Sequence, residues 1–108
     1  MRQLSVEEIQ QALDLRKDGW SRVWNYQASH SWFELCVVSP KFAGNFHLFC
    51  GACTRIECDI SWMPLYIQIE KVGNDYIVKD GAHLFVKCGL FVGKYNVPPI
   101  FHNDIQKV

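Results

Sequence analysis

Apolar and polar side chains alternate with a period of two through most of this chain after Trp20, and this alternation narrows the choice of folds. The clearest example is Thr54 to Trp62, where every second side chain is apolar and those between are charged or polar. A β-strand with one buried and one solvated face has this pattern, because successive side chains point to opposite faces of the sheet. The alternation therefore predicts a mainly β domain.

Further segments show the same alternation or an apolar run of strand length: Trp20 to Gln27, Trp32 to Val38, Phe46 to Cys50, Leu65 to Glu70, Tyr76 to Lys79 and Leu84 to Val92. Residues that favour turns separate these segments, and Asp80-Gly81 predicts a two-residue hairpin turn. About seven short antiparallel strands at this spacing predict a small barrel or a strongly curved sheet. A β-sandwich is the alternative.

The N-terminal segment has a helical pattern instead. Ser5 followed by Glu8 has the spacing of a capping box, and the residues after it form an amphipathic stretch. We expect a helix over about 5–18, with Gly19 as its left-handed C-terminal cap. Because the strands at 33–38 and 84–92 are apolar on both faces, we also expect this helix to cover one open end or one outer face of the β structure.

The length and composition indicate one domain. The chain has 108 residues, 49% of them hydrophobic, which is enough for a single core over 1–108. Within that domain we expect a β region over about 20–101 and a short polar tail over 102–108.

The charge balance and the lack of long apolar runs restrict the classes of partner that we expect. The chain has 11 basic and 11 acidic residues, and the basic positions are scattered, so we expect no nucleic-acid partner. A net charge of zero leaves little repulsion between copies and permits a homo-oligomer. The segment Met1 to Leu15 lacks a signal-peptide core, and no run is long enough to span a bilayer. We therefore expect a cytoplasmic protein with no membrane partner.

The cysteines are the first candidates for chemistry. An odd number, five, in a chain of this size favours reduced thiols over a disulfide framework. Cys50 and Cys53 have a spacing that can bring two sulfurs to one metal ion, and Cys88, Cys58 or His47 could complete a zinc shell. A second cysteine pair of this spacing is missing, so buried thiols without a cofactor are favoured. A zinc-stabilised domain that uses Cys50, Cys53 and Cys88 remains an alternative.

Catalysis has weaker signals, and we assign no catalytic residue. A thiol-dependent enzyme that uses Cys88 or Cys50 would need a base within hydrogen-bond reach, and the sequence does not indicate one. A redox dithiol at Cys50 and Cys53 would need a following helix, whereas a strand follows. A thiol-dependent enzyme is a further alternative to a non-catalytic protein.

Aromatic residues form the second candidate site. Trp20, Trp24 and Tyr26 alternate on one face of the first strand with Arg22 among them, and Trp32 follows a short loop. Such a face can bind a ligand through ring stacking, with Arg22 contributing a cation–π contact; core packing is the alternative for these rings. The leading hypothesis is a non-catalytic binding domain without a cofactor, presenting this aromatic and apolar surface to a protein or a small ligand.

Overall fold

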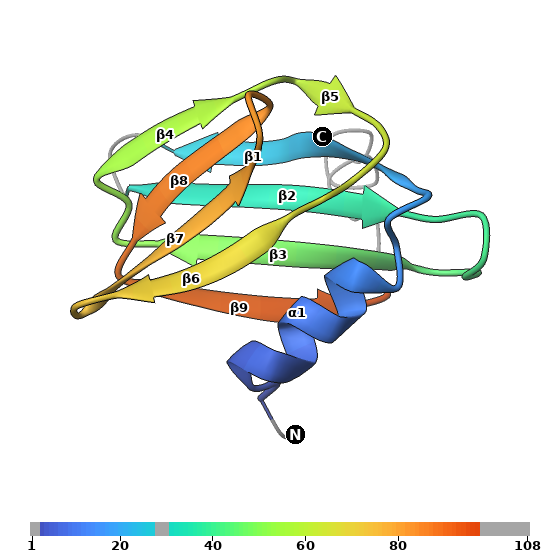
Figure 1. Ribbon diagram of the computed structural model, residues 1–108, viewed down its shortest axis with the longest axis horizontal. Helices are drawn as coiled ribbons and strands as arrows, with labels where there is room; N and C mark the ends of the chain where they lie inside the picture. The colour runs from blue at the N-terminus through green and yellow to red at the C-terminus, as the bar shows by residue number, and fades with distance from the viewer. Residues whose placement is uncertain (1–2, 28–30, 98–108) are drawn as a thin grey trace, which may run out of the picture.

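The computed structural model describes residues 3–27 and 31–97, which form one helix and nine strands (Figure 1). The helix is α1 (Val6–Asp14). The strands are β1 (Trp20–Gln27), β2 (Trp32–Val38), β3 (Asn45–Gly51), β4 (Arg55–Cys58), β5 (Ser61–Trp62), β6 (Gln68–Val72), β7 (Asp75–Asp80), β8 (Leu84–Cys88) and β9 (Leu90–Tyr95). The predicted polar tail at 102–108 lies outside the described residues.

The strands form two antiparallel sheets packed face to face. The five-stranded sheet has the order β5-β1-β2-β3-β9, and the four-stranded sheet has the order β4-β8-β7-β6. Among the described residues no strand of one sheet pairs with a strand of the other. The mainly β fold class with an N-terminal helix is therefore confirmed, and the strands form the alternative, a sandwich, rather than a closed barrel.

Helix α1 lies beside the edge strands β6 and β9 (Figure 1). Nε2 of Gln10 donates to the Ile67 carbonyl at 2.9 Å, and Oε1 of Gln10 accepts from the Ile69 backbone N–H at 2.8 Å. On the side of β9, a Cβ added to Gly93 would lie 3.0 Å from Cγ1 of Ile9. The helix thus occupies the space in which β6 and β9 would pair in a barrel, and it does not cover an outer face.

Both ends of α1 were predicted, and only the first prediction is correct. The capping box is present, because the Ser5 N–H donates to Glu8 Oε1 and the Glu8 N–H donates to Ser5 Oγ. The helix ends early, at Asp14, and Gly19 does not have the positive φ of a left-handed cap. Instead, a Cβ on Gly19 would lie 2.1 Å from the carbonyl oxygen of Val38. Gly19 is required by this close approach of two backbone segments.

The bounds of β1 and β2 match the prediction, but two other predicted strands are each divided. The strand predicted over Thr54–Trp62 becomes β4 and β5, because the chain bends at Asp59 and Ile60 and leaves Ile60 81% exposed. The strand predicted over Leu84–Val92 becomes β8 and β9, which belong to different sheets. Gly89 is the point at which the chain changes sheet.

Two local details also differ from the prediction. The strand predicted over 65–70 begins at Gln68, although Leu65 is buried in the core as the alternation predicts. Between β7 and β8, Asp80 pairs with Leu84, which leaves three residues in the turn instead of the predicted two.

The core lies between the two sheets, and β2 is buried on both of its faces. Phe33, Leu35 and Val37 point into the core, while Glu34 and Cys36 on the opposite face are buried as well. The buried apolar residues of this core are Ile9, Ala12, Leu13, Phe33, Leu35, Val37, Phe46, Leu48, Cys50, Trp62, Leu65, Ile67, Val78, Leu84, Val86 and Cys88. The core between the sheets buries only the inward-pointing side chains of β2. Other side chains must therefore bury those on its outer face.

The close contact at Gly19 gives a first test of the fold. Gly19→Ala should lower the free energy of unfolding by about 1–3 kcal/mol, because the new methyl group meets a backbone carbonyl that cannot rotate away. Urea unfolding followed by circular dichroism measures the change. Gly73→Asn is the control, because Gly73 has a φ of 63° and open space around it, and asparagine tolerates this conformation. Equal stability of Gly19→Ala and the wild type would contradict the conclusion that the close backbone approach requires glycine at this position.

Candidate functional site

The outer face of the five-stranded sheet carries four of the five residues predicted to bind a ligand. The strand register places Arg22, Cys36, His47 and Lys94 in one row across β1, β2, β3 and β9. Neighbours along the strands, such as Leu35, point into the core, so this row points away from it. We define the outer face by the side chains of Trp20, Arg22, Trp24, Trp32, Glu34, Cys36, His47, Phe49 and Lys94.

A buried carboxylate–imidazole pair lies at the centre of the outer face. Oε2 of Glu34 and Nδ1 of His47 are 2.5 Å apart, and the side chains are 9% and 0% exposed, respectively. His47 is directly opposite Cys36, so Glu34 reaches it diagonally across the two strands. Nε2 of His47 is buried and makes no hydrogen bond within the described part of the chain. The carboxylate and the imidazole are in direct contact, as in an acid–base dyad, but the imidazole is fully buried and not accessible to solvent.

Aromatic rings form the cover over this pair. The Trp24 ring meets the His47 ring edge to face, with centroids 5.2 Å apart and an interplanar angle of 74°. The Phe49 ring lies 6.1 Å from the ring of His47 and 5.6 Å from the ring of Trp32. These are the spacings of favourable aromatic contacts, so part of the aromatic surface keeps water from the polar pair.

Two exposed cations lie among these rings. The Arg22 guanidinium lies 5.3 Å from the ring of Trp20 and 5.6 Å from the ring of Trp24, which are cation–π distances. The ammonium of Lys94 lies 5.6 Å from the ring of Phe49. Both cations are exposed, and neither forms an ion pair with residues 3–27 or 31–97. The exposed charge of the outer face is therefore positive.

A β-bulge at Trp24 decides which predicted residues share this face. The register of β1 on β2 runs from Val23 opposite Leu35 to Asn25 opposite Glu34, which leaves Trp24 as the extra residue. As a result, Tyr26 lies opposite the core residue Phe33, on the other face of the sheet. The prediction that Tyr26 shares a face with Trp20 and Trp24 is therefore wrong. Trp20, Arg22 and Trp24 lie close together on the outer face, and Trp32 lies on the same face beside Phe49.

Glu34, Phe49 and Lys94 were not predicted from the sequence, and His47 was predicted only as a possible zinc ligand. A signal was present for two of them, because Glu34 and His47 are polar residues inside segments that are otherwise apolar on both faces. A buried polar side chain in such a strand needs a partner. Which residue serves as the partner depends on the register between β2 and β3, and periodicity does not give that register.

The cysteines of the zinc alternative do not lie on the outer face. Cys50 and Cys88 are buried in the core, and Cys53 is half-buried, with its Sγ donating to the Cys50 carbonyl at 3.4 Å. All five cysteines are free thiols. Among the described residues no group of three or more His, Cys, Asp or Glu side chains is arranged to hold a metal ion. The structure thus gives the zinc alternative no support.

The remaining thiols are poor nucleophiles. Burial raises the pKa of Cys36, which lies next to the Glu34–His47 pair, and it raises the pKa of Cys53 to about 11. Burial and the nearby Asp59 raise the pKa of Cys58 to about 12. Because the thiolate is the reactive form, these cysteines remain unreactive thiols near neutral pH. The thiol-dependent enzyme alternative gains no support from them.

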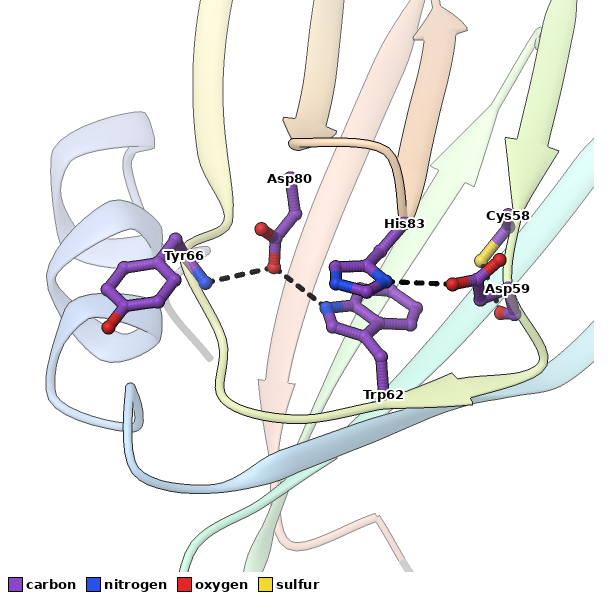
Figure 2. A network of polar contacts seen from close by, with 6 residues as sticks. All are labelled: Cys58, Asp59, Trp62, Tyr66, Asp80 and His83. Atoms are coloured by element: carbon purple, nitrogen blue, oxygen red, sulfur yellow. Dashed lines mark hydrogen bonds and ion pairs between the residues drawn. The ribbon is translucent and has the colours of Figure 1, made fainter.

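A separate polar network lies where β5 meets the turn between β7 and β8 (Figure 2). The buried carboxylate of Asp80 accepts from Nε1 of Trp62 at 2.7 Å and from the Tyr66 backbone N–H at 2.9 Å. His83 stacks on the Trp62 ring at an interplanar angle of 8°, and its Nδ1 lies 2.8 Å from Oδ2 of Asp59. The network ties one sheet to the other, which indicates a structural role.

The fold and the outer face define a small antiparallel β-sandwich with a covered polar pair and exposed cations among aromatic rings. The chain matches no protein-family model, no curated protein and no solved structure. No helix in the described part of the chain has the length and apolar character needed to cross a membrane. The function must therefore be inferred from the outer face itself.

A double-mutant cycle tests the coupling of the buried pair. Glu34→Leu and His47→Leu should each lower the free energy of unfolding by about 1–3 kcal/mol, because each leaves a buried polar group without its partner. The double variant leaves neither group, so it should lose less than the sum of the two single losses, as urea unfolding would show. Strictly additive losses would mean that the two side chains do not stabilise each other.

The network at Asp80 gives a second stability test. Asp80→Ala should lower the free energy of unfolding by about 1–3 kcal/mol, because it leaves the buried indole N–H of Trp62 unpaired. Asp59→Ala is the matched control in the same network, since Asp59 is 54% exposed and its ion pair with His83 contributes about 1 kcal/mol or less. If the two variants lose equal stability in urea unfolding, Asp80 is not the residue that holds the network.

Proposed function

We propose that this protein is a non-catalytic binding module and that the outer face is its binding surface. The observation that carries the proposal is the position of Arg22, an exposed cation held between the rings of Trp20 and Trp24 without an acidic partner among the described residues. A guanidinium supported in this way has lost part of its side-chain freedom before a ligand arrives. Arginine and tryptophan are also the residues that most often carry binding energy at interfaces.

The charges on the outer face favour a ligand with carboxylates. The planar guanidinium of Arg22 can bind a carboxylate through two parallel hydrogen bonds. Lys94 provides a second positive charge, while the acidic residue of the face, Glu34, is buried and bound to His47. Arg22 and Lys94 lie on strands three spacings apart, which corresponds to about 14 Å. The best match is an extended protein segment with acidic residues at both ends of a short apolar stretch.

The rings account for the apolar part of the ligand. Trp20, Trp24 and Trp32 are half-buried, so each keeps part of its ring surface on the outer face. Apolar side chains of a bound segment would remove that remaining surface from water, which contributes about 25 cal/mol per Å². We propose binding rather than catalysis for the outer face because the His47 imidazole is buried and the protonated Cys36 thiol is only 3% exposed. Neither group can reach a bound substrate.

A synthetic peptide tests this proposal directly. The probe is N-acetyl-Glu-Leu-Phe-Leu-Glu-amide, whose two carboxylates lie about 13 Å apart in an extended chain. In heteronuclear NMR spectra of the labelled protein, the peptide should shift the amide signals of β1, β2 and β3. The same peptide with Lys in place of Glu should bind at least about 5-fold more weakly, because it meets like charges.

Variants of two matched arginines identify the surface. Arg22→Gln should weaken binding of the acidic peptide by about 5-fold or more. Arg55→Gln is the control and should leave binding unchanged, because Arg55 also stacks on a ring, that of Phe85, but lies on the four-stranded sheet and is paired with Glu57. Equal binding of the acidic and basic peptides, or equal losses in the two variants, would refute the proposed chemistry.

A further inference from the structure

A cavity of about 200 Å³ lies between the first turn of α1 and the two sheets. Leu4, Val6 and Ile9 line it from the side of α1, and Tyr76 of β7 and Phe91 of β9 line it from the sheets. The rings of Tyr76 and Phe91 meet edge to face, with centroids 4.7 Å apart and an interplanar angle of 83°. Ile9 is buried, but the other four residues keep part of their surface exposed. A small molecule can therefore reach the cavity from solvent.

The path of the chain leaves this space open. At Gly89 the chain crosses from β8 in the four-stranded sheet to β9 in the five-stranded sheet, and this crossing forms one wall of the cavity. Leu90, the first residue of β9, also lines the cavity, yet it stays 49% exposed. The wall thus consists largely of apolar side chains that the fold does not fully cover, which is the usual character of a ligand cavity.

An exposed ammonium group lies beside the cavity. Nζ of Lys71 is 6.0 Å from the centroid of the Tyr76 ring. Lys71 pairs with Tyr76 across β6 and β7, so both side chains lie on the face of the sheet that points to the core. Lys71 forms no ion pair within the segments 3–27 and 31–97, whereas Lys79 and Lys87 of the same sheet are each paired with a carboxylate. A ligand that contacts the Tyr76 ring can therefore place an anionic group on Lys71.

We propose that this cavity binds a small carboxylate with an apolar body, such as an aromatic ring on a short chain. An apolar cavity of about 150 Å³ is large enough for benzene. The larger volume of this cavity leaves room for a short chain as well. The rings of Tyr76 and Phe91 would contact the aromatic ring of the ligand, and Lys71 would bind its carboxylate.

This site is separate from the outer face. Phe91 pairs with the core residue Cys50, and Tyr76 packs against the core, so both rings lie on the inner sides of their sheets. Arg22, in contrast, belongs to the row of side chains that points away from the core. The inference is therefore independent of the proposed binding function, and the two can fail separately.

An NMR titration of the labelled full chain tests the site. The probe is hydrocinnamate, a phenyl ring on a short chain that ends in a carboxylate, and hydrocinnamyl alcohol is its neutral match. At neutral pH hydrocinnamate should shift the amide signals of Val6, Gly89 and Phe91 and leave that of Arg22 unchanged. The alcohol should bind at least about 3-fold more weakly, because it cannot form a charge-assisted hydrogen bond with Lys71.

Two matched lysines identify the charge. Lys71→Gln should weaken binding of hydrocinnamate by about 3-fold or more and leave binding of the alcohol unchanged. Lys79→Gln is the control and should leave binding of both compounds unchanged. Its ammonium is paired with Glu70 at 3.1 Å, and its side chain lies on the opposite face of the sheet from the core residue Val78.

A cavity-filling variant identifies the place. Val6→Phe puts a ring into the cavity and should weaken binding of both compounds by about 10-fold or more, while circular dichroism establishes that the variant is folded. If Val6→Phe does not fold, the two lysine variants decide the outcome. The proposal is overturned by no shifts at about 10 mM hydrocinnamate, by equal binding of the acid and the alcohol, by shifts centred on Arg22 instead of Gly89, or by equal losses in the two lysine variants.

Discussion

A carboxylate and an imidazole can be buried on the outer side of a β-sheet only if they bind each other and if large side chains exclude water from them. Glu34 and His47 meet the first condition, with Oε2 and Nδ1 2.5 Å apart. Trp24 and Phe49 meet the second, since both rings lie beside the imidazole. Part of the aromatic surface of this sheet therefore covers the buried polar pair. A ligand would use the surface that remains.

This requirement also explains why β2 tolerates burial on both faces. Its inner side chains, such as Leu35, are stabilised by the apolar core between the sheets. Its outer side chains, Glu34 and Cys36, have no second sheet above them in the described residues, and they lie under side chains of their own sheet instead. The bulge at Trp24 assists, because an extra residue in β1 places this indole against the pair without changing the register near Trp20.

Periodicity predicts those parts of this structure in which a strand keeps one face to the core. The bounds of β1 and β2 and the positions of Trp20 and Arg22 on the outer face are of this kind. The capping box at Ser5 was predicted instead from the residue types and their spacing at the start of the helix. Periodicity fails where the chain changes direction within an apolar run, as at Gly89, because both sheets bury apolar residues and the pattern looks continuous. It also misses the Glu34–His47 contact, which depends on the pairing of β2 with β3, and the bulge at Trp24, which adds a residue without altering the composition.

Strand β3 contributes to the outer face and to the core. Its alternation directs His47 and Phe49 to the outer face and Leu48 and Cys50 to the core, so one short strand supports both the aromatic cover and the packing between the sheets. A change confined to a side chain on one face leaves the packing of the other face in place, because the sheet backbone lies between them.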